Sequence, residues 1–138
     1  MEKFLGSPYP IIKNPHGFFK TQSGVSQIKS DLLVLLLTNP GERVFLPDFG
    51  TPLKELIFEP NDASLAAKAK SMIINSIKTW EPRIAVTDIQ VSNNISKSDL
   101  DPYDAQEDID NILNIKILFV DPEQIKEVQE LRLQIPLA

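Results

Sequence analysis

Prolines mark the ends of the helical patterns in this chain and so limit how it can fold. Because proline lacks an N–H and its ring clashes with the preceding turn, a helix ends at or before it unless the proline lies in the first turn. The Asn39-Pro40-Gly41 step is expected to end a helix over residues 24–38. Pro82 is expected to end a second, longer helix that runs to about Trp80.

A short helix is expected between these two longer ones. Thr51 can cap it, and Pro52 suits its first helical position. The Phe58-Glu59-Pro60 step ends it, and Asn61 or Asp62 then caps the longest helix. That helix carries one apolar stripe at helical spacing, made by Leu65, Ala69, Met72, Ile73, Ile77 and Trp80.

Three segments after Pro82 alternate as half-buried strands do. In residues 84–91 the apolar phase flips, which predicts a bulge near Thr87-Asp88. Residues 112–120 and 131–135 alternate without a break. The chain is therefore predicted to be an α+β domain: an extended N-terminal arm, two longer helices with a short one between, packed on a small sheet formed by a β-hairpin plus a C-terminal strand.

The arm is assigned to residues 1–22, and residues 23–138 are assigned to a single domain, which fits a length of 138 residues. Prolines prevent a regular helix in the arm. Its aromatic side chains favour burial, so the arm is expected to lie extended over a surface. These aromatic residues are Phe4, Tyr9, Phe18 and Phe19.

The connector over residues 42–50 is expected to be a scaffold turn with one short strand at residues 43–46. Within it, Arg43 and Asp48 are expected to pair with each other inside the domain. The residues assigned to this turn are Gly41, Glu42, Arg43, Pro47, Asp48, Phe49 and Gly50.

Arg83 has two interpretations. The residue follows Glu81-Pro82, which restricts its exit from the helix, and its planar guanidinium suits bidentate pairing with a carboxylate. It either forms an internal salt bridge, to Asp48 or Glu59, or docks on a partner. The residues alone leave both readings open.

Composition argues against several chemistries. The chain has no cysteine and a single histidine, His16, so thiol catalysis, disulfides and His-rich zinc sites are excluded. The net charge is −5, of which the segment 99–110 contributes −6, leaving a body near neutrality without the basic stripe of a nucleic-acid-binding protein. The longest apolar run, residues 32–37, is far shorter than the ~20 residues of a membrane span. No cofactor or metal is predicted, and the acidic segment is interpreted as a solvated loop.

A glycosidase would need two carboxylates flanking a sugar. The candidates are Asp48, Glu59 and Glu81, and each lies at an element end beside a proline, where carboxylates commonly cap or pair with arginine. The catalytic set is therefore predicted to be empty, with a muralytic, lysozyme-like hydrolase kept as the alternative.

An ordered set of short motifs resembles the baseplate wedge and sheath-initiator family of contractile phage tails, with relatives in type VI secretion and extracellular contractile injection system baseplates. The resemblance runs from about residue 4 to 84. Its motifs are Phe4-Leu5-Gly6-Ser7-Pro8-Tyr9-Pro10-Ile11, Leu36-Leu37-Thr38-Asn39-Pro40-Gly41-Glu42-Arg43, Leu46-Pro47-Asp48-Phe49-Gly50, Leu56-Ile57-Phe58-Glu59-Pro60-Asn61 and Trp80-Glu81-Pro82-Arg83-Ile84. Two features depart from the family pattern, namely Ser7-Pro8-Tyr9 in the arm and the long acidic insert 93–111.

The resemblance implies a non-enzymatic structural protein of the tail baseplate in the virion, assembled in the host cytoplasm. It implies that Glu81, Pro82 and Arg83 dock on the wedge core bundle. It also implies that the first ring of sheath subunits adds strands at Leu131, Leu133 and Ile135. The implied partners are other wedge proteins, the tail sheath protein, and tube or hub proteins.

Independently of any family, three strands are too few to close a barrel, so sheet edges remain, and a strand near the C-terminus suits strand exchange. Besides the hydrolase, the alternatives are a baseplate component of a non-phage injection system and an adaptor unrelated to tails.

Overall fold

A computed structural model describes residues 6–60, 62–92, 112–122 and 126–136 of the chain. Its elements follow the order α1 (Gly24–Leu37), the 3₁₀ helix η1 (Leu53–Phe58), α2 (Ala63–Trp80), β1 (Ala85–Ser92), β2 (Ile112–Val120) and β3 (Val128–Pro136). Helices and an antiparallel sheet are segregated along the chain, which confirms the predicted α+β class.

The sheet is a three-stranded antiparallel meander in the order β1-β2-β3. The register between β1 and β2 shifts between Val86 and Asp88, which confirms the predicted bulge. β3 pairs with β2 from Val128 to Pro136, so it begins earlier than the predicted segment 131–135. Because β2 lies in the middle, β3 is an edge strand.

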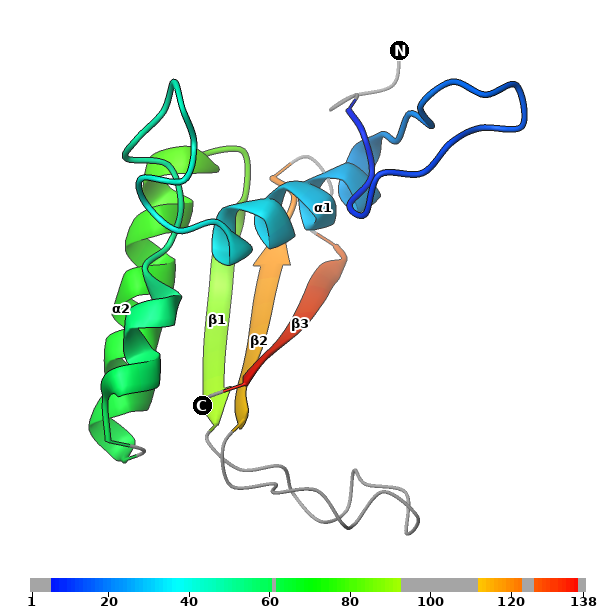
Figure 1. Ribbon diagram of the computed structural model, residues 1–138. Helices are drawn as coiled ribbons and strands as arrows, with labels where there is room; N and C mark the ends of the chain where they lie inside the picture. The colour runs from blue at the N-terminus through cyan, green and yellow to red at the C-terminus, as the bar shows by residue number, and fades with distance from the viewer. Residues whose placement is uncertain (1–5, 61, 93–111, 123–125, 137–138) are drawn as a thin grey trace, which may run out of the picture.

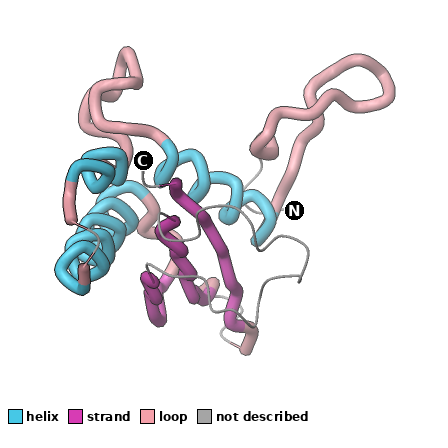
Figure 2. Tube along the Cα trace, turned by 60° about the horizontal axis from the view of Figure 1, so that its bottom comes forward, coloured by secondary structure: helices cyan, strands magenta, loops and turns pink. Residues whose placement is uncertain are grey.

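Both helices lie on the same side of the sheet, with α1 crossing the strands and α2 running beside β1 (Figures 1 and 2). The side chains of β2 explain this arrangement, because they alternate between fully buried and partly buried along the whole strand. The buried set, which faces the helices, is Leu113, Ile115, Ile117 and Phe119. The sheet therefore forms one apolar layer and the helices the other.

The apolar stripes of the helices complete the core. In α1, Ile28, Leu32 and Leu35 are at most 2% exposed. In α2, the predicted stripe is buried or packed against the core along its full length, from Leu65 to Trp80. Asp62 caps α2 as predicted, with its side-chain Oδ1 accepting hydrogen bonds from the backbone N–H groups of Ser64 and Leu65.

The prediction for Thr51 was wrong. Its side chain does not cap η1, and the N-cap position is taken by Pro52. Thr51 is fully buried instead, and its hydroxyl donates to the carbonyl oxygen of Leu35 at 3.2 Å. The residue therefore ties the start of η1 to the last turn of α1, a contact that a local capping rule does not consider.

The described part of the N-terminal arm, which begins at Gly6, does not lie extended over the surface; Phe4 lies outside the described residues. Residues 6–22 double back as a hairpin that projects from the body (Figure 1), closed at its base by paired hydrogen bonds between Gly6 and Gln22 at 2.7 and 2.8 Å. Phe18 and Phe19 are 73% and 69% exposed rather than packed. The conformation of residues 6–22 is therefore determined by backbone hydrogen bonds within the arm and not by burial of its aromatic rings.

The connector between α1 and η1 is a closed loop. The N–H of Thr51 donates to the carbonyl oxygen of Thr38 at 2.9 Å, so residues 39–50 leave and return to the same point. Gly50 makes this close approach possible: its φ is +125°, and a Cβ there would lie 2.3 Å from the Thr38 carbonyl oxygen. The predicted strand at residues 43–46 is absent, because this stretch consists of turns.

Gly50→Ala is expected to destabilise the domain more than Gly41→Ala in the same loop. Gly41 also has a positive φ, of +92°, but a Cβ there would meet open space. The left-handed backbone alone costs roughly 1–2 kcal/mol for a residue with a Cβ, and Gly50→Ala adds a clash with backbone. Urea denaturation of both variants measures the difference. Equal losses of unfolding free energy would show that the close contact with Thr38 does not constrain the loop.

Candidate docking site

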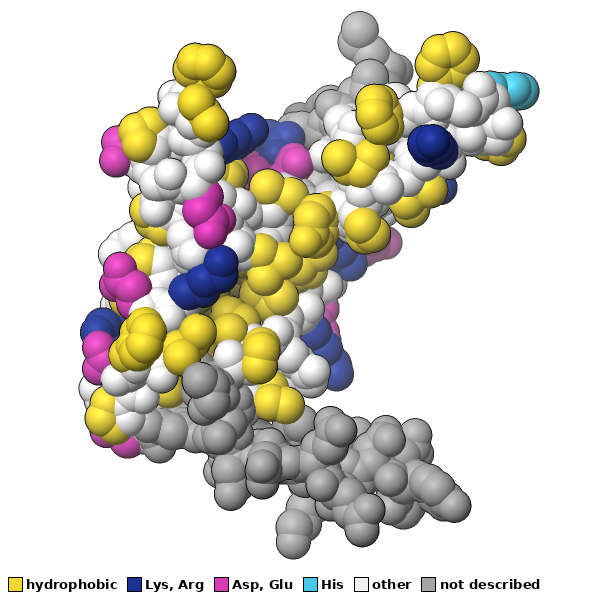
Figure 3. Space-filling model, viewed as in Figure 1, with side chains coloured by type: hydrophobic (Ala, Val, Ile, Leu, Met, Phe, Trp, Pro, Cys, Tyr) yellow, Lys and Arg dark blue, Asp and Glu magenta, His cyan; other side chains and the backbone are white. Residues whose placement is uncertain are grey.

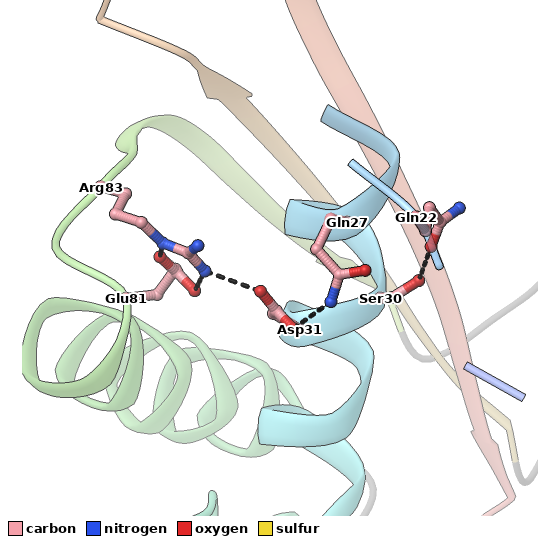
Figure 4. Close-up of polar contacts among 6 residues, drawn as sticks. All are labelled: Gln22, Gln27, Ser30, Asp31, Glu81 and Arg83. Carbon is pink, nitrogen blue, oxygen red and sulfur yellow. Dashed lines mark hydrogen bonds and ion pairs between the residues drawn. The ribbon is translucent and has the colours of Figure 1, made fainter. Parts of the chain in front are cut away.

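The segment that joins α2 to β1 carries the charged group predicted to dock on a partner. The helix ends at Trp80, Glu81 takes the C-cap position, and its N–H still donates to the carbonyl oxygen of Ile77 at 2.8 Å. Pro82 is exposed and prevents the helix from continuing. Arg83 follows within the turn, so its side chain folds back toward Glu81 (Figure 4).

Arg83 bridges two carboxylates that come from different elements. Its Nε and one terminal nitrogen donate to the two carboxylate oxygens of Glu81, each at 2.5 Å, which is a bidentate pair. The same terminal nitrogen donates to Oδ2 of Asp31 on α1 at 2.7 Å (Figure 4). The arginine therefore braces the α2–β1 turn against α1.

The three charged side chains differ in exposure. The side chain of Glu81 is only 7% exposed, whereas those of Arg83 and Asp31 are 33% and 35% exposed. The hydrogen bonds that Arg83 donates to Glu81 are the largest cause of a raised pKa of its guanidinium; partial burial opposes this, and the bond to Asp31 adds to it. The guanidinium thus stays charged, and a third of its side chain still faces outward.

Two further groups of polar contacts lie on α1 between Asp31 and the N-terminal hairpin. Nε2 of Gln27, one turn earlier in α1, donates to Oδ1 of Asp31 at 2.8 Å. On the neighbouring face, Oγ of Ser30 donates to Oε1 of Gln22 at 2.9 Å and accepts from the N–H of Tyr9 at 3.3 Å. Figure 4 shows Gln22, Gln27, Ser30, Asp31, Glu81 and Arg83 between the α2–β1 turn and the hairpin base.

Arg83 does form an internal salt bridge, as one of its two interpretations predicted, but the predicted partners were wrong. The described ion pairs join Arg83 to Glu81 and Asp31, and not to Asp48 or Glu59. Glu59 instead pairs with Lys68 of α2 at 2.5 Å. Sequence reasoning missed Asp31. Its one signal was the Gln27–Asp31 spacing of four, which places both side chains on one face of the helix.

The scaffold-turn residues do lie together in the closed loop, but the pairing expected within it was wrong. The guanidinium of Arg43 lies 4.6 Å above the ring of Phe49, a cation–π contact, and none of the described ion pairs joins it to Asp48. Phe49 in turn meets Trp80 edge-on, with ring centroids 5.3 Å apart. The loop is thus anchored beside Glu81.

Glu42 fastens the other side of the loop. Its carboxylate accepts from the N–H and side-chain amide of Asn39 at 3.0 and 3.1 Å and pairs with Lys54 at 3.2 Å. The bond from the Asn39 backbone, followed by that from Lys54, lowers the pKa of this exposed carboxyl. The N–H of Gly41 donates to the carbonyl oxygen of Pro47 at 2.7 Å and closes the neck.

The residues predicted for strand addition lie on β3, the edge strand. Leu131 is 7% exposed, and Leu133 and Ile135 are partly buried. Through their β2 partners Ile117, Ile115 and Leu113, all three share the apolar face of the sheet. These side chains pack inward, so a pairing strand would meet the outer backbone edge of β3.

The candidate catalytic carboxylates do not form a pair. Glu81 is held by Arg83 and Glu59 by Lys68, on opposite ends of α2. A cavity of about 270 Å³ beside the loop is lined by Asn39, Pro40, Pro52, Lys54, Glu55 and Phe58, which include none of the three candidates. Within residues 6–60, 62–92, 112–122 and 126–136, no cluster of three or more His, Asp or Glu side chains could hold a metal ion. The acidic segment 99–110 lies outside the described residues.

None of the helices that the structure describes is long and apolar enough to cross a membrane.

The fold occurs in a solved baseplate structure. A chain of the anti-feeding prophage (AFP) baseplate is 25% identical and superposes with a TM-score of 0.67, covering 85% of this chain and 84% of that chain. A candidate tail lysozyme from Geobacter sulfurreducens superposes with a TM-score of 0.68, covering 85% of this chain and 94% of that chain. The latter is 21% identical, so its likeness shows the fold alone.

Residues 22–120 match the family model described as baseplate wedge protein gp25. The chain belongs to this family of baseplate wedge proteins, as the ordered motifs predicted. It is 34% identical over 61 residues to baseplate wedge protein gp25 of Enterobacteria phage T4. That match covers 44% of this chain and 46% of the T4 protein, about half the length of the relative.

Arg83→Met is expected to destabilise the domain by about 2–4 kcal/mol, because it leaves the buried Glu81 carboxylate without its partner. Asp31→Asn is the milder control, with a loss below about 1.5 kcal/mol, since Asp31 is a third exposed and water can replace the lost charge contact. The double variant Glu81→Gln, Arg83→Met should regain part of the stability. Chemical denaturation measures all three, and a stable Arg83→Met protein would contradict the bracing role.

Proposed function

We propose that this chain is a non-enzymatic structural protein of the baseplate of a contractile phage tail, and that it is part of the virion. The observation that carries the proposal is its membership of the baseplate wedge family together with the open edge of β3. Assembly takes place with other baseplate proteins in the host cytoplasm.

The first contact in this proposal is with the wedge. The docking point consists of Glu81, Pro82 and Arg83. The geometry supports a different role for the buried residue than for the two accessible ones. Glu81 is buried and holds Arg83 in place, while Pro82 and a third of the Arg83 side chain remain accessible. A preorganised arginine loses little freedom on pairing with an acidic or carbonyl group of a wedge protein.

The second contact is with the sheath. β3 pairs with β2 on one side only, within the described sheet, so its other side presents backbone N–H and C=O groups. A strand of a sheath subunit can pair there and extend the sheet, as in β-augmentation. Since β3 is paired over nine residues, from Val128 to Pro136, the edge is long enough to define a register for the incoming strand.

No geometric feature of the residues that the structure describes favours a hydrolase. Of the three candidate carboxylates, Glu59 is paired with Lys68 and Glu81 with Arg83, at opposite ends of α2. The name of the Geobacter protein belongs to that protein, and its likeness to this chain concerns the fold.

The sheath contact can be tested by site-specific crosslinking, because the chain has no cysteine of its own. Gln134→Cys places a thiol on β3, and Gln90→Cys places one on β1. Both side chains are exposed on the same polar face of the sheet, beside Asn114 and Lys116 of β2. Modified with a benzophenone maleimide and incorporated into tail particles, the Gln134→Cys protein should crosslink to the sheath protein on illumination.

The Gln90→Cys protein is the matched control, since it lies at the opposite edge of the sheet. It should give much less of the sheath adduct, as judged by mass spectrometry of the crosslinked bands. Equal adducts from both positions, or none from Gln134→Cys in assembled particles, would overturn strand addition at β3.

A further inference from the structure

The loop of residues 39–50 is larger than the connection between α1 and η1 requires. Its ends are joined by the Thr51 N–H···O=C Thr38 bond of 2.9 Å, so a much shorter turn could make the same link. A compact surface excursion whose two ends meet is an Ω-loop, a class of loop that frequently carries function. The projecting part of the loop stands clear of the body in Figure 1.

The loop is held rigidly at its base and neck. Gly50 is buried against the Thr38–Asn39 backbone, and Glu42 bonds Asn39 and Lys54. Gly41 bonds Pro47, so the two sides of the neck are also joined to each other. The loop therefore holds its shape before any partner arrives, and binding would cost little conformational entropy.

The tip of this rigid loop is apolar. Val44 is 87% exposed and Phe45 94% exposed, and Leu46 beside them is 41% exposed. Figure 3 shows hydrophobic side chains at the outermost point of this projection. Exposure of a whole phenyl ring on a preorganised loop adds nothing to the stability of the isolated domain, since the ring is not removed from water.

The loop is continuous with the docking point. Arg43 lies over Phe49, and Phe49 meets Trp80, which directly precedes Glu81. A partner that reaches Arg83 therefore comes to the same end of the molecule as the loop tip. The rim of the tip carries the acids Glu42 and Asp48 and the base Arg43, so the apolar patch is small and bounded by both charges.

We propose that Val44 and Phe45 form a preformed apolar knob that inserts into an apolar pocket of the wedge protein docked at Arg83. This inference rests on the proposed function and adds a second, hydrophobic contact to it. The acids Glu42 and Asp48 that flank the knob disfavour the alternative of insertion into an anionic membrane. In this site Phe45 is the anchor, since aromatic side chains that fill pockets dominate binding free energies.

The test is co-purification of the tagged full-length chain with the wedge proteins of its own machine, co-expressed from their genes. Phe45→Ser should lower the recovered wedge protein by about tenfold or more, the range of a hot-spot residue, with an unchanged melting temperature because the ring is exposed. Phe58→Ser is the matched control, since Phe58 is 90% exposed but lies on η1 outside the loop. Its recovery should change less than about twofold, as expected outside a hot spot.

The outcomes separate the two proposals. If the unmodified chain co-purifies with wedge proteins and Phe45→Ser does so equally well, the knob is wrong and the baseplate function stands. If the unmodified chain recovers no wedge protein, both the apolar knob and the proposed baseplate function are wrong. Binding to vesicles of phosphatidylcholine and phosphatidylglycerol, or a concentration-dependent dimer in light scattering, that is lost in Phe45→Ser would assign the tip to a membrane or to a second copy and overturn the proposal.

Discussion

Burial of one face of a three-stranded sheet is the constraint on which the rest of the structure depends. Four side chains of β2 are at most 1% exposed, because α1 and α2 lie over that face. α2 packs on β1 and α1 reaches β3, so each outer strand has its own helix. A sheet of this size cannot close on itself, and within the described residues β3 is paired on one side only.

The ion network of Arg83 is a second brace, placed where the apolar core ends. It joins α1 to the turn between α2 and β1. A buried charge pair of this kind contributes little net stability, because desolvation of the charges opposes their attraction. What it supplies is a fixed orientation. The same arginine can therefore hold the domain together and present its exposed part to a partner, so the two interpretations are compatible.

The elements of the fold were predictable because each is encoded locally. The helical stripe from Leu65 to Trp80, the Asp62 cap and the phase flip in β1 all follow from spacing within a few residues. Two of the contacts that were missed or wrongly predicted join distant segments, whereas the wrong partner of Arg43 lay within its own loop. Arg83 pairs with Asp31, which is far from it in the sequence. The hydroxyl of Thr51 donates to the carbonyl oxygen of Leu35 instead of capping η1. The hairpin of residues 6–22 was missed because its backbone pairing leaves aromatic side chains exposed, against the expectation of burial.

The central claim is that β3 is completed by a strand of the sheath in the assembled particle. A cryo-EM map of the tail, at a resolution that separates strands, tests this most directly. The account predicts a sheath segment paired along the outer side of residues 128–136, continuing the β1-β2-β3 sheet. A map in which that edge of β3 faces solvent, or pairs with a protein other than the sheath, would contradict it.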